Sequence, residues 1–98
     1  MRTTIVRYKV KPDRVAEHEG LIRAVYAELA TTRPPDLRYA AFKQADGVSF
    51  VHISFTSAPG NPLEQISAFR AFTANIRERC DEPPVAAQLE EVGNYGLC

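Results

Sequence analysis

Apolar and polar residues alternate along three stretches of the chain, and this alternation predicts β-strands. In residues 3–11, apolar side chains alternate with mostly charged ones, which is typical of a strand with one apolar face. Two further β-rich runs, residues 37–44 and 48–57, flank Asp46-Gly47, the strongest short-range signal for a β-hairpin. A two-residue turn at this pair places Phe42 opposite Val51 and Ala40 opposite Ile53.

Two other stretches repeat apolar residues every three or four positions, which predicts helices. The first helix begins near Asp13, an N-cap candidate, and ends near Thr31; its stripe is Val15, His18, Ile22, Val25, Tyr26 and Leu29. The second begins at Asn61-Pro62, as N-cap and first helical residue, and continues to about Cys80. We expect Asp81 to Pro84 to break it, and residues 85–93 to form a last strand with weak alternation and a bulge near its end.

The resulting order, β-α-β-β-α-β, predicts a single α+β domain over residues 1–98. It is the ferredoxin-like arrangement, in which a four-stranded antiparallel sheet carries both helices on one face. We expect the helices to cover the face with Val6, Tyr8 and Val10, and also the hairpin face that carries Phe42, Val51, Ile53 and Phe55.

The other sheet face is then too apolar for water, because it would carry Ile5, Leu37, Tyr39, Phe50 and His52. An exposed apolar patch of this kind usually marks an interface. The sequence therefore predicts a homodimer in which two sheets pack face to face into a barrel.

Composition narrows the function classes. Twelve basic and twelve acidic side chains cancel, which disfavours nucleic-acid binding. No apolar run is long enough to span a membrane, and the N-terminal residues lack the apolar core of a signal peptide, so we expect a cytoplasmic protein. Cys80 and Cys98 lack the spacing of a zinc or redox site and are expected to be free thiols, Cys98 in a frayed, inert end.

Three segments give the chain a resemblance to a known family. They are Asp-Gly-Val-Ser-Phe-Val-His-Ile (46–53), Ala-Phe-Arg-Ala-Phe (68–72) and Glu-Val-Gly-Asn-Tyr (91–95). With the element order, they resemble the antibiotic biosynthesis monooxygenase (ABM)-like family of the dimeric α+β barrel superfamily, over nearly the whole chain.

The resemblance implies cofactor-independent oxygenation of a small aromatic or polyketide-like substrate, such as an electron-rich phenol or anthrone. Other members imply isomerase-like or unknown roles, and one branch degrades haem. That branch uses an Asn on the first strand and a Trp on the second helix. This chain has Val6 near the former position and no Trp, so we do not expect haem degradation.

Several residues are candidates for a site. His52 could act as a general base on a phenol, because an ordinary histidine pKa lies near neutrality; alternatively it is a hydrogen-bonded interface histidine. Aromatic walls with few polar groups suit a flat aromatic ligand, and the residues expected to bind it are Tyr8, His18, Tyr26, Tyr39, Phe69 and Phe72. Simple core packing is the alternative for each tyrosine and phenylalanine, and a hydrogen-bonded histidine at the edge of the helix is the alternative for His18. No metal-ligand spacing is present, no cofactor is expected, and a non-enzymatic ligand-binding or stress-response dimer is the second functional hypothesis.

Overall fold

The computed structural model describes residues 1–97 and has the predicted ferredoxin-like architecture. Its sheet is antiparallel throughout, with strand order β2-β3-β1-β4. The elements in chain order are β1 (Arg2–Val10), η1 (Pro12–Arg14), α1 (Val15–Thr32), β2 (Leu37–Lys43), β3 (Ser49–Thr56), η2 (Pro62–Gln65), α2 (Ser67–Ala74), α3 (Ile76–Arg79) and β4 (Cys80–Leu89).

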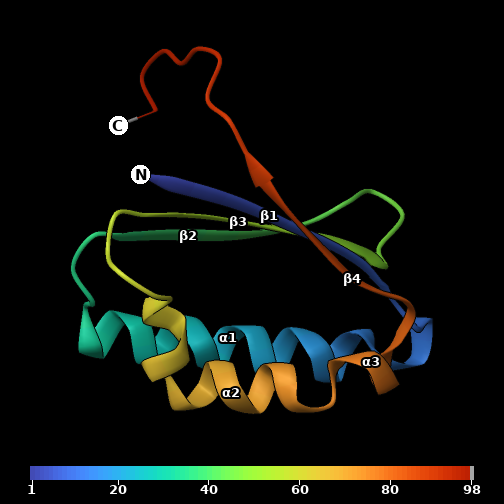
Figure 1. Ribbon diagram of the computed structural model, residues 1–98. Helices are drawn as coiled ribbons and strands as arrows, with labels where there is room; N and C mark the ends of the chain where they lie inside the picture. Colours follow the sequence, from blue (N-terminus) through green and yellow to red (C-terminus); the bar gives the residue numbers. More distant parts are fainter. Residues whose placement is uncertain (98) are drawn as a thin grey trace.

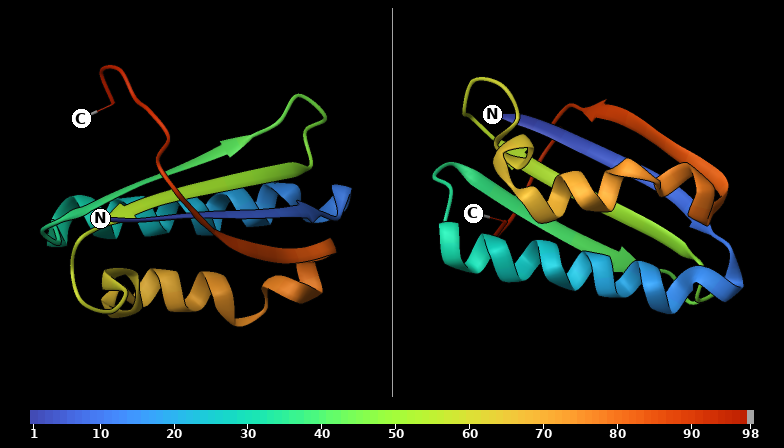
Figure 2. Two further views of the ribbon diagram at one scale, coloured as in Figure 1. Left: turned by 45° about the horizontal axis from the view of Figure 1, so that its top comes forward. Right: turned by 90° about the horizontal axis from the view of Figure 1, so that it is seen from below.

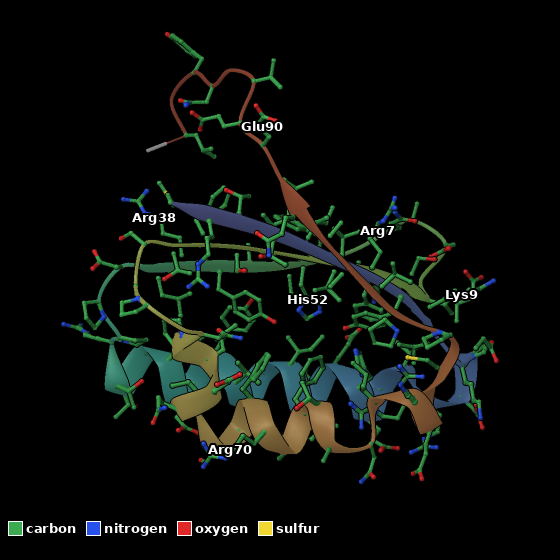
Figure 3. The ribbon with its side chains drawn as sticks, viewed as in Figure 1. Arg7, Lys9, Arg38, His52, Arg70 and Glu90 are labelled. Carbon is green, nitrogen blue, oxygen red and sulfur yellow. The ribbon has the colours of Figure 1, made fainter. Side chains whose placement is uncertain are left out.

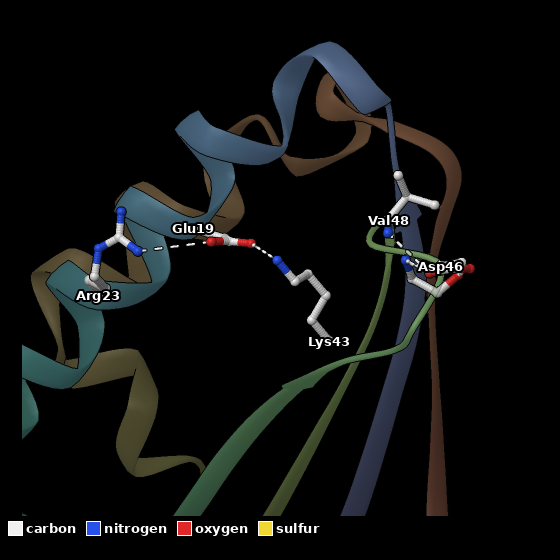
Figure 4. Close-up of polar contacts among 6 residues, drawn as sticks. Glu19, Arg23, Lys43, Asp46 and Val48 are labelled. Carbon is white, nitrogen blue, oxygen red and sulfur yellow. Dashed lines mark hydrogen bonds and ion pairs between the residues drawn. The ribbon is translucent and has the colours of Figure 1, made fainter.

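The helices form one layer and the sheet forms the other. Figure 1 shows α1 and α2 beneath the same face of the sheet, and the view from below shows them side by side (Figure 2). The opposite face of the sheet is uncovered, and the chain after β4 leaves the body on that side. Lys43 at the end of β2 contacts Glu19 of α1 at 2.6 Å (Figure 4), which joins the two layers at the surface.

The hairpin has the predicted register but a longer turn. Phe42 pairs with Val51 and Ala40 with Ile53, as expected. The strands end at Lys43 and resume at Ser49, so the connection is longer than two residues. The Asp46 carboxylate accepts hydrogen bonds from the backbone N–H groups of Val48 and Ser49 at 3.0 and 2.9 Å (Figure 4), and Gly47 has φ +78°.

The two hairpin faces are the reverse of what we expected. β3 pairs with β1 so that Tyr8 lies opposite Phe50 and Val6 opposite His52. Cross-strand partners share a face, so Tyr39, Phe50 and His52 point toward the helices together with Tyr8. The prediction that Phe42, Val51, Ile53 and Phe55 meet the helices is wrong: they lie on the uncovered face, where Phe42 is 55% exposed.

That error has a definite physical source. Each strand of the hairpin carries apolar residues on both faces, so its own period does not say which face is inside. The pairing of β3 with β1 decides the question, because Tyr8 and Val10 are buried on β1 and fix their cross-strand neighbours to the same side.

The first helical segment begins differently from the prediction, whereas the second begins as predicted but does not continue as one helix. Asp13 lies within η1 and is not the N-cap of α1; that position is occupied by Arg14, whose side chain makes no capping bond. The Asn61 side chain does cap, accepting from the N–H of Leu63 at 3.0 Å, but the segment that follows is the short η2. The continuous helix expected from Asn61 to Cys80 is wrong, because Ile66 and Asn75 have non-helical backbones and divide it into η2, α2 and α3.

The last strand also corrects the prediction. β4 runs from Cys80 to Leu89, so Asp81 to Pro84 lie inside the strand rather than before it, and residues 90–93 lie outside it. Pro83 and Pro84 are tolerated because β4 is an edge strand. The irregularity in its pairing with β1 falls opposite Arg7 to Val10, near the start of β4, instead of near its end.

The core lies between the sheet and the helices. Its buried apolar residues are Tyr8, Val10, Val25, Phe50, Phe72 and Cys80. Polar and charged side chains are buried beside them: His18, His52, Thr56 and Arg79. No helix within residues 1–97 is long and apolar enough to cross a membrane. Cys80 is a buried free thiol, and the expectation for Cys98 falls outside the described residues.

Candidate functional site

A cavity of about 390 Å³ lies between the helix-facing side of the sheet and α2. All four strands contribute to its sheet side, and η2, α2 and α3 contribute to its helical side. Its aromatic lining is Tyr8, Tyr39, His52, Phe69 and Phe72; Val6, Leu63 and Ile76 add aliphatic surface; the polar rim includes Arg2, Thr4, Ser54, Asn61 and Gln88. A volume of this size accommodates a small aromatic molecule.

A chain of hydrogen bonds runs behind and along one wall of the cavity. The Tyr8 hydroxyl oxygen lies 2.6 Å from His18 Nε2 and 2.6 Å from His52 Nε2. The other ring nitrogen of His52, Nδ1, lies 2.5 Å from the Tyr39 hydroxyl. Figure 3 shows His52 projecting from β3 into the space between sheet and helices, whereas Arg7 and Arg38 lie on the other side of the sheet.

Strand pairing explains why these groups meet. Tyr8 and His52 come from neighbouring strands on one face, and Tyr39 comes from the next strand along. His18 lies in the first turns of α1, on the helical side of Tyr8, and is fully buried. The aromatic rings pack closely: His52 stacks on Phe72 with centroids 5.6 Å apart, and Tyr8 stacks on Phe50 at 5.6 Å.

The electrostatics of the site favour neutral groups. Burial lowers the pKa of His52 to about 4, and burial, together with the nearby Arg79 and His52, lowers the pKa of His18 to about 4. Burial also raises the pKa of Tyr8 and Tyr39 well above the ordinary tyrosine value, and raises that of Tyr26 to about 12. At neutral pH the hydrogen-bonded network of Tyr8, His18, His52 and Tyr39 therefore consists of neutral imidazoles and protonated phenols.

Arg79, the last residue of α3, is the charged member of this network. Its side chain is 2% exposed. Nε donates to His18 Nδ1 at 3.2 Å, one terminal nitrogen donates to the backbone carbonyl of Phe72, and the guanidinium carbon lies 5.7 Å from the centroid of the Phe72 ring. Among residues 1–97, no carboxylate lies within ion-pair distance of it.

The structure brings five of the seven predicted site residues together around the cavity: Tyr8, Tyr39, His52, Phe69 and Phe72. His18 is behind the wall; it contacts the lining residue Tyr8 through a hydrogen bond and the lining residue Phe72 with ring centroids 5.1 Å apart. Tyr26 stacks on Tyr39 with ring centroids 5.4 Å apart but lines a separate, shallower pocket. Its hydroxyl is buried and has no hydrogen-bond partner among the described residues.

Sequence reasoning missed two arginines. Arg79 falls near the end of the predicted second helix, and no local pattern distinguishes it from exposed Arg77. Arg2 lines the cavity rim, where its guanidinium donates to the carbonyls of Ala58 and Gly60. The sequence around these two arginines does not indicate that they belong to the site, because both reach it through contacts between distant segments.

Chemically, the cavity offers aromatic faces with one hydrogen-bonding end. A flat ring can stack between Phe69, Phe72 and Tyr39, while the tyrosine–histidine chain meets a polar substituent. In residues 1–97, no three His, Cys, Asp or Glu side chains lie close enough together to hold a metal ion.

Comparison with solved structures finds the same fold in several proteins. A candidate antibiotic biosynthesis monooxygenase from Nitrosomonas europaea is 18% identical, with a TM-score of 0.77 over 95% of this chain and 100% of that one. SnoaB, a cofactor-independent oxygenase from Streptomyces nogalater solved as a point mutant, is 17% identical, with a TM-score of 0.71 over 97% of this chain and 96% of that one.

Other structures of the same fold have no stated activity. One is a Nitrosomonas europaea protein of unknown function, which is 17% identical, with a TM-score of 0.70 over 96% of this chain and 91% of that one. No protein-family model matches the sequence, and no curated protein matches it. The predicted resemblance to antibiotic biosynthesis monooxygenases is therefore confirmed as a likeness of fold over about 95% of the chain.

Proposed function

We propose that the protein is a cofactor-independent monooxygenase-like enzyme that acts on a small aromatic or polyketide-like molecule. The observation that carries the proposal is the aromatic cavity with the Tyr8–His52–Tyr39 chain along its wall. The fold it shares with SnoaB supports the same class of reaction. Fold alone does not determine activity, so the proposal rests on the site.

The cavity residues have separate tasks in this proposal. Phe69 and Phe72 hold the substrate ring, and the tyrosines with His52 hold an oxygen substituent of that ring. Hydrogen bonding to an enolate or phenolate oxygen stabilises the electron-rich form of the substrate, which is the form that reacts with O₂. An apolar enclosure also keeps water from the reactive intermediate.

The reaction balances without a cofactor. In an anthrone-type substrate, the ring CH₂ loses two hydrogens and becomes a carbonyl. One atom of O₂ becomes the carbonyl oxygen and the other leaves as water with both hydrogens. The four electrons that reduce O₂ come from the substrate carbon, so no external reductant is needed.

Oxygen uptake with anthrone as the probe tests the proposal. We expect O₂ consumption equal to anthraquinone formed, and one labelled oxygen atom in the product from ¹⁸O₂. Because His52 holds both tyrosines, we expect His52→Ala to reduce the rate by about 10²-fold, a typical effect of one positioned polar group. Arg7→Ala is the matched control, since Arg7 lies on the opposite face of the sheet.

Two results would contradict the enzyme proposal. One is product formation no faster than in buffer, with anthrone shown to bind. The other is a His52→Ala variant that turns over anthrone at the wild-type rate.

The second candidate is a non-enzymatic ligand-binding dimer of the same fold. It is favoured by one observation: both ring nitrogens of His52 have partners, so no imidazole nitrogen is free to act on a ligand directly. Tight binding of anthrone without oxygen uptake would support this alternative over the enzyme.

We also propose that the protein is a homodimer, paired through the uncovered sheet face. The apolar side chains on that face are Ile5, Ala40, Phe42, Val51, Ile53, Phe55, Val85, Ala87 and Leu89. Phe42 and Val85 are 55% and 64% exposed, which favours burial against a second copy.

We also propose that the protein is cytoplasmic. The free thiol of Cys80 fits a reducing compartment.

A further inference from the structure

The hydrogen-bond chain in the cavity wall has a direction, and Arg79 fixes it. A guanidinium has only N–H donors and keeps its proton under all ordinary conditions. Its Nε donates to His18 Nδ1, so Nδ1 must be the acceptor nitrogen of that ring. The neutral His18 then carries its hydrogen on Nε2.

The direction passes from ring to ring. His18 Nε2–H donates to the Tyr8 oxygen, so the Tyr8 hydroxyl is free to donate to its other neighbour, His52 Nε2. His52 then carries its hydrogen on Nδ1 and donates it to the Tyr39 oxygen. Each group accepts one bond and donates the next, which is the arrangement in which successive bonds strengthen one another.

The reverse direction is disfavoured at one point. It would place a hydrogen on His18 Nδ1, so that two N–H donors would face each other over the 3.2 Å between His18 and Arg79. A buried donor with no acceptor carries a full desolvation penalty. Arg79 is 2% exposed, and water gives little relief there.

The chain of hydrogen bonds therefore ends at Tyr39, whose own hydroxyl hydrogen is not donated to any other member of that chain. Tyr39 lines the cavity, and in residues 1–97 its hydroxyl has no hydrogen-bond partner besides His52. We infer that Arg79 is a positioning residue that makes Tyr39 a hydrogen-bond donor to the cavity, so that the site takes aromatic ligands bearing an acceptor oxygen, a ketone or a phenolate. This inference rests on the proposed function only in assuming that the cavity holds a ligand.

In this arrangement His52 has a different role from that of a general base. Its Nε2 accepts from Tyr8 and its Nδ1–H donates to Tyr39, so it orients and polarises Tyr39 and does not take a proton from the ligand itself. The ligand is bound through its oxygen as the keto or anionic form, and the developing negative charge on that oxygen is met by the Tyr39 O–H.

The tautomers of the two histidines give the most direct test, and the wild-type protein is sufficient for it. Nitrogen-15 chemical shifts and long-range ¹H–¹⁵N couplings distinguish Nδ1–H from Nε2–H imidazoles. We expect the Nε2–H form for His18 and the Nδ1–H form for His52. The Nε2–H form of His52, or a mixture of both forms in either ring, would overturn the inference.

Substitution of the arginine tests its role. In Arg79→Met, His18 Nδ1 loses its obligatory donor, so we expect both tautomers of His18 and of His52 to be populated. Arg77→Met is the control, since Arg77 is an exposed residue of the same short helix. Unchanged tautomers in a folded Arg79→Met protein would show that another feature sets the direction. If that variant does not fold, the wild-type tautomers still decide.

Three bicyclic probes of similar size test the ligand class. 1-Indanone presents an acceptor oxygen, indole presents a donor N–H, and indane presents neither. We expect 1-indanone to bind about three- to tenfold more tightly than indane, which is the usual effect of one hydrogen bond. Tyr39→Phe should abolish this preference and leave the binding of indane unchanged.

Tighter binding of indole than of 1-indanone would contradict the inference, as would a preference that survives Tyr39→Phe or no binding of any probe at millimolar concentration. These readouts are separate from turnover. Failure to consume O₂ with anthrone, with the tautomers and the indanone preference as expected, would remove the enzyme proposal and leave this inference standing.

Discussion

At the scale of single residues, the buried imidazoles couple the fold to pH. Burial lowers the pKa of His52 from 6.5 to about 4, so the unfolded chain binds a proton more readily than the native protein does. The free energy of unfolding therefore falls as pH falls from about 6.5 toward 4, and is fully regained above that range. One pKa unit corresponds to about 1.4 kcal/mol, so the difference between 6.5 and about 4 makes the full effect of His52 about 3–4 kcal/mol.

Urea denaturation at pH 7, 5.5 and 4.5 measures this effect. The comparison is with His52→Phe, which keeps an aromatic ring beside Phe72 but does not titrate. Carboxylates that titrate over the same range contribute equally to both proteins, so the difference in slope reports the titration of His52 together with its effect on His18. Parallel pH dependences for the two proteins would show that His52 is not held neutral by burial.

Sequence alone predicted the aromatic residues of the site but not the hydrogen bonds that join them. Tyr8, Phe69 and Phe72 were found because each lies on a strand or helix whose period is readable from sequence. Tyr39 was named for its residue type, although the hairpin pattern had placed it on the other sheet face. The chain of hydrogen bonds that joins the tyrosines was not predicted, because it depends on a contact between Arg79 and His18, which are 61 positions apart. The sequence identified residue types suited to a site, while strand pairing decided which of them meet.

At the scale of elements, prediction was accurate where local chemistry decides the outcome. The stripe of α1, the Asn61 cap and the register of the hairpin all follow from residues close in sequence. It failed where tertiary contacts override local signals. Pro83 and Pro84 indicate a break, yet the edge position of β4 accepts them, because one side of an edge strand needs no hydrogen-bond partner.

Helix α1 carries one residue that weakens it without an evident packing role. Gly20 is exposed within the helix, and a Cβ built on it would have no atom within 4 Å. We expect Gly20→Ala to stabilise the protein by about 0.5–1 kcal/mol, because alanine reduces the freedom of the unfolded chain and strains nothing in the helix.

Gly47 provides the opposite control. It also has open space around it, but its φ of +78° is unfavourable for alanine, so Gly47→Ala should destabilise by about 1 kcal/mol. Urea denaturation of both variants measures the two signs. Destabilisation by Gly20→Ala would mean that the helix needs a glycine there for a reason outside its backbone.

At the scale of the whole molecule, one face of the sheet is uncovered and carries exposed apolar side chains. The sequence pointed to a dimer through one face of the sheet, and the structure exchanges the residues that form it: Phe42 and Val85 lie there, whereas Tyr39 and His52 lie in the cavity. The proposed interface is thus separate from the candidate site, and each can be disrupted without altering the other.

This separation makes the dimer proposal testable by itself. We expect light scattering after size-exclusion chromatography to give twice the chain mass at micromolar concentration. Phe42→Lys with Val85→Lys should shift the protein to monomers, because two buried lysines per chain would face a second copy's apolar sheet. Both positions are more than half exposed in the single chain, so circular dichroism should be unchanged. Ala71→Lys, on the exposed side of α2, is the control that should remain dimeric. A monomeric wild-type protein would exclude this face as the interface. A Phe42→Lys, Val85→Lys double variant that stays dimeric would exclude it as well.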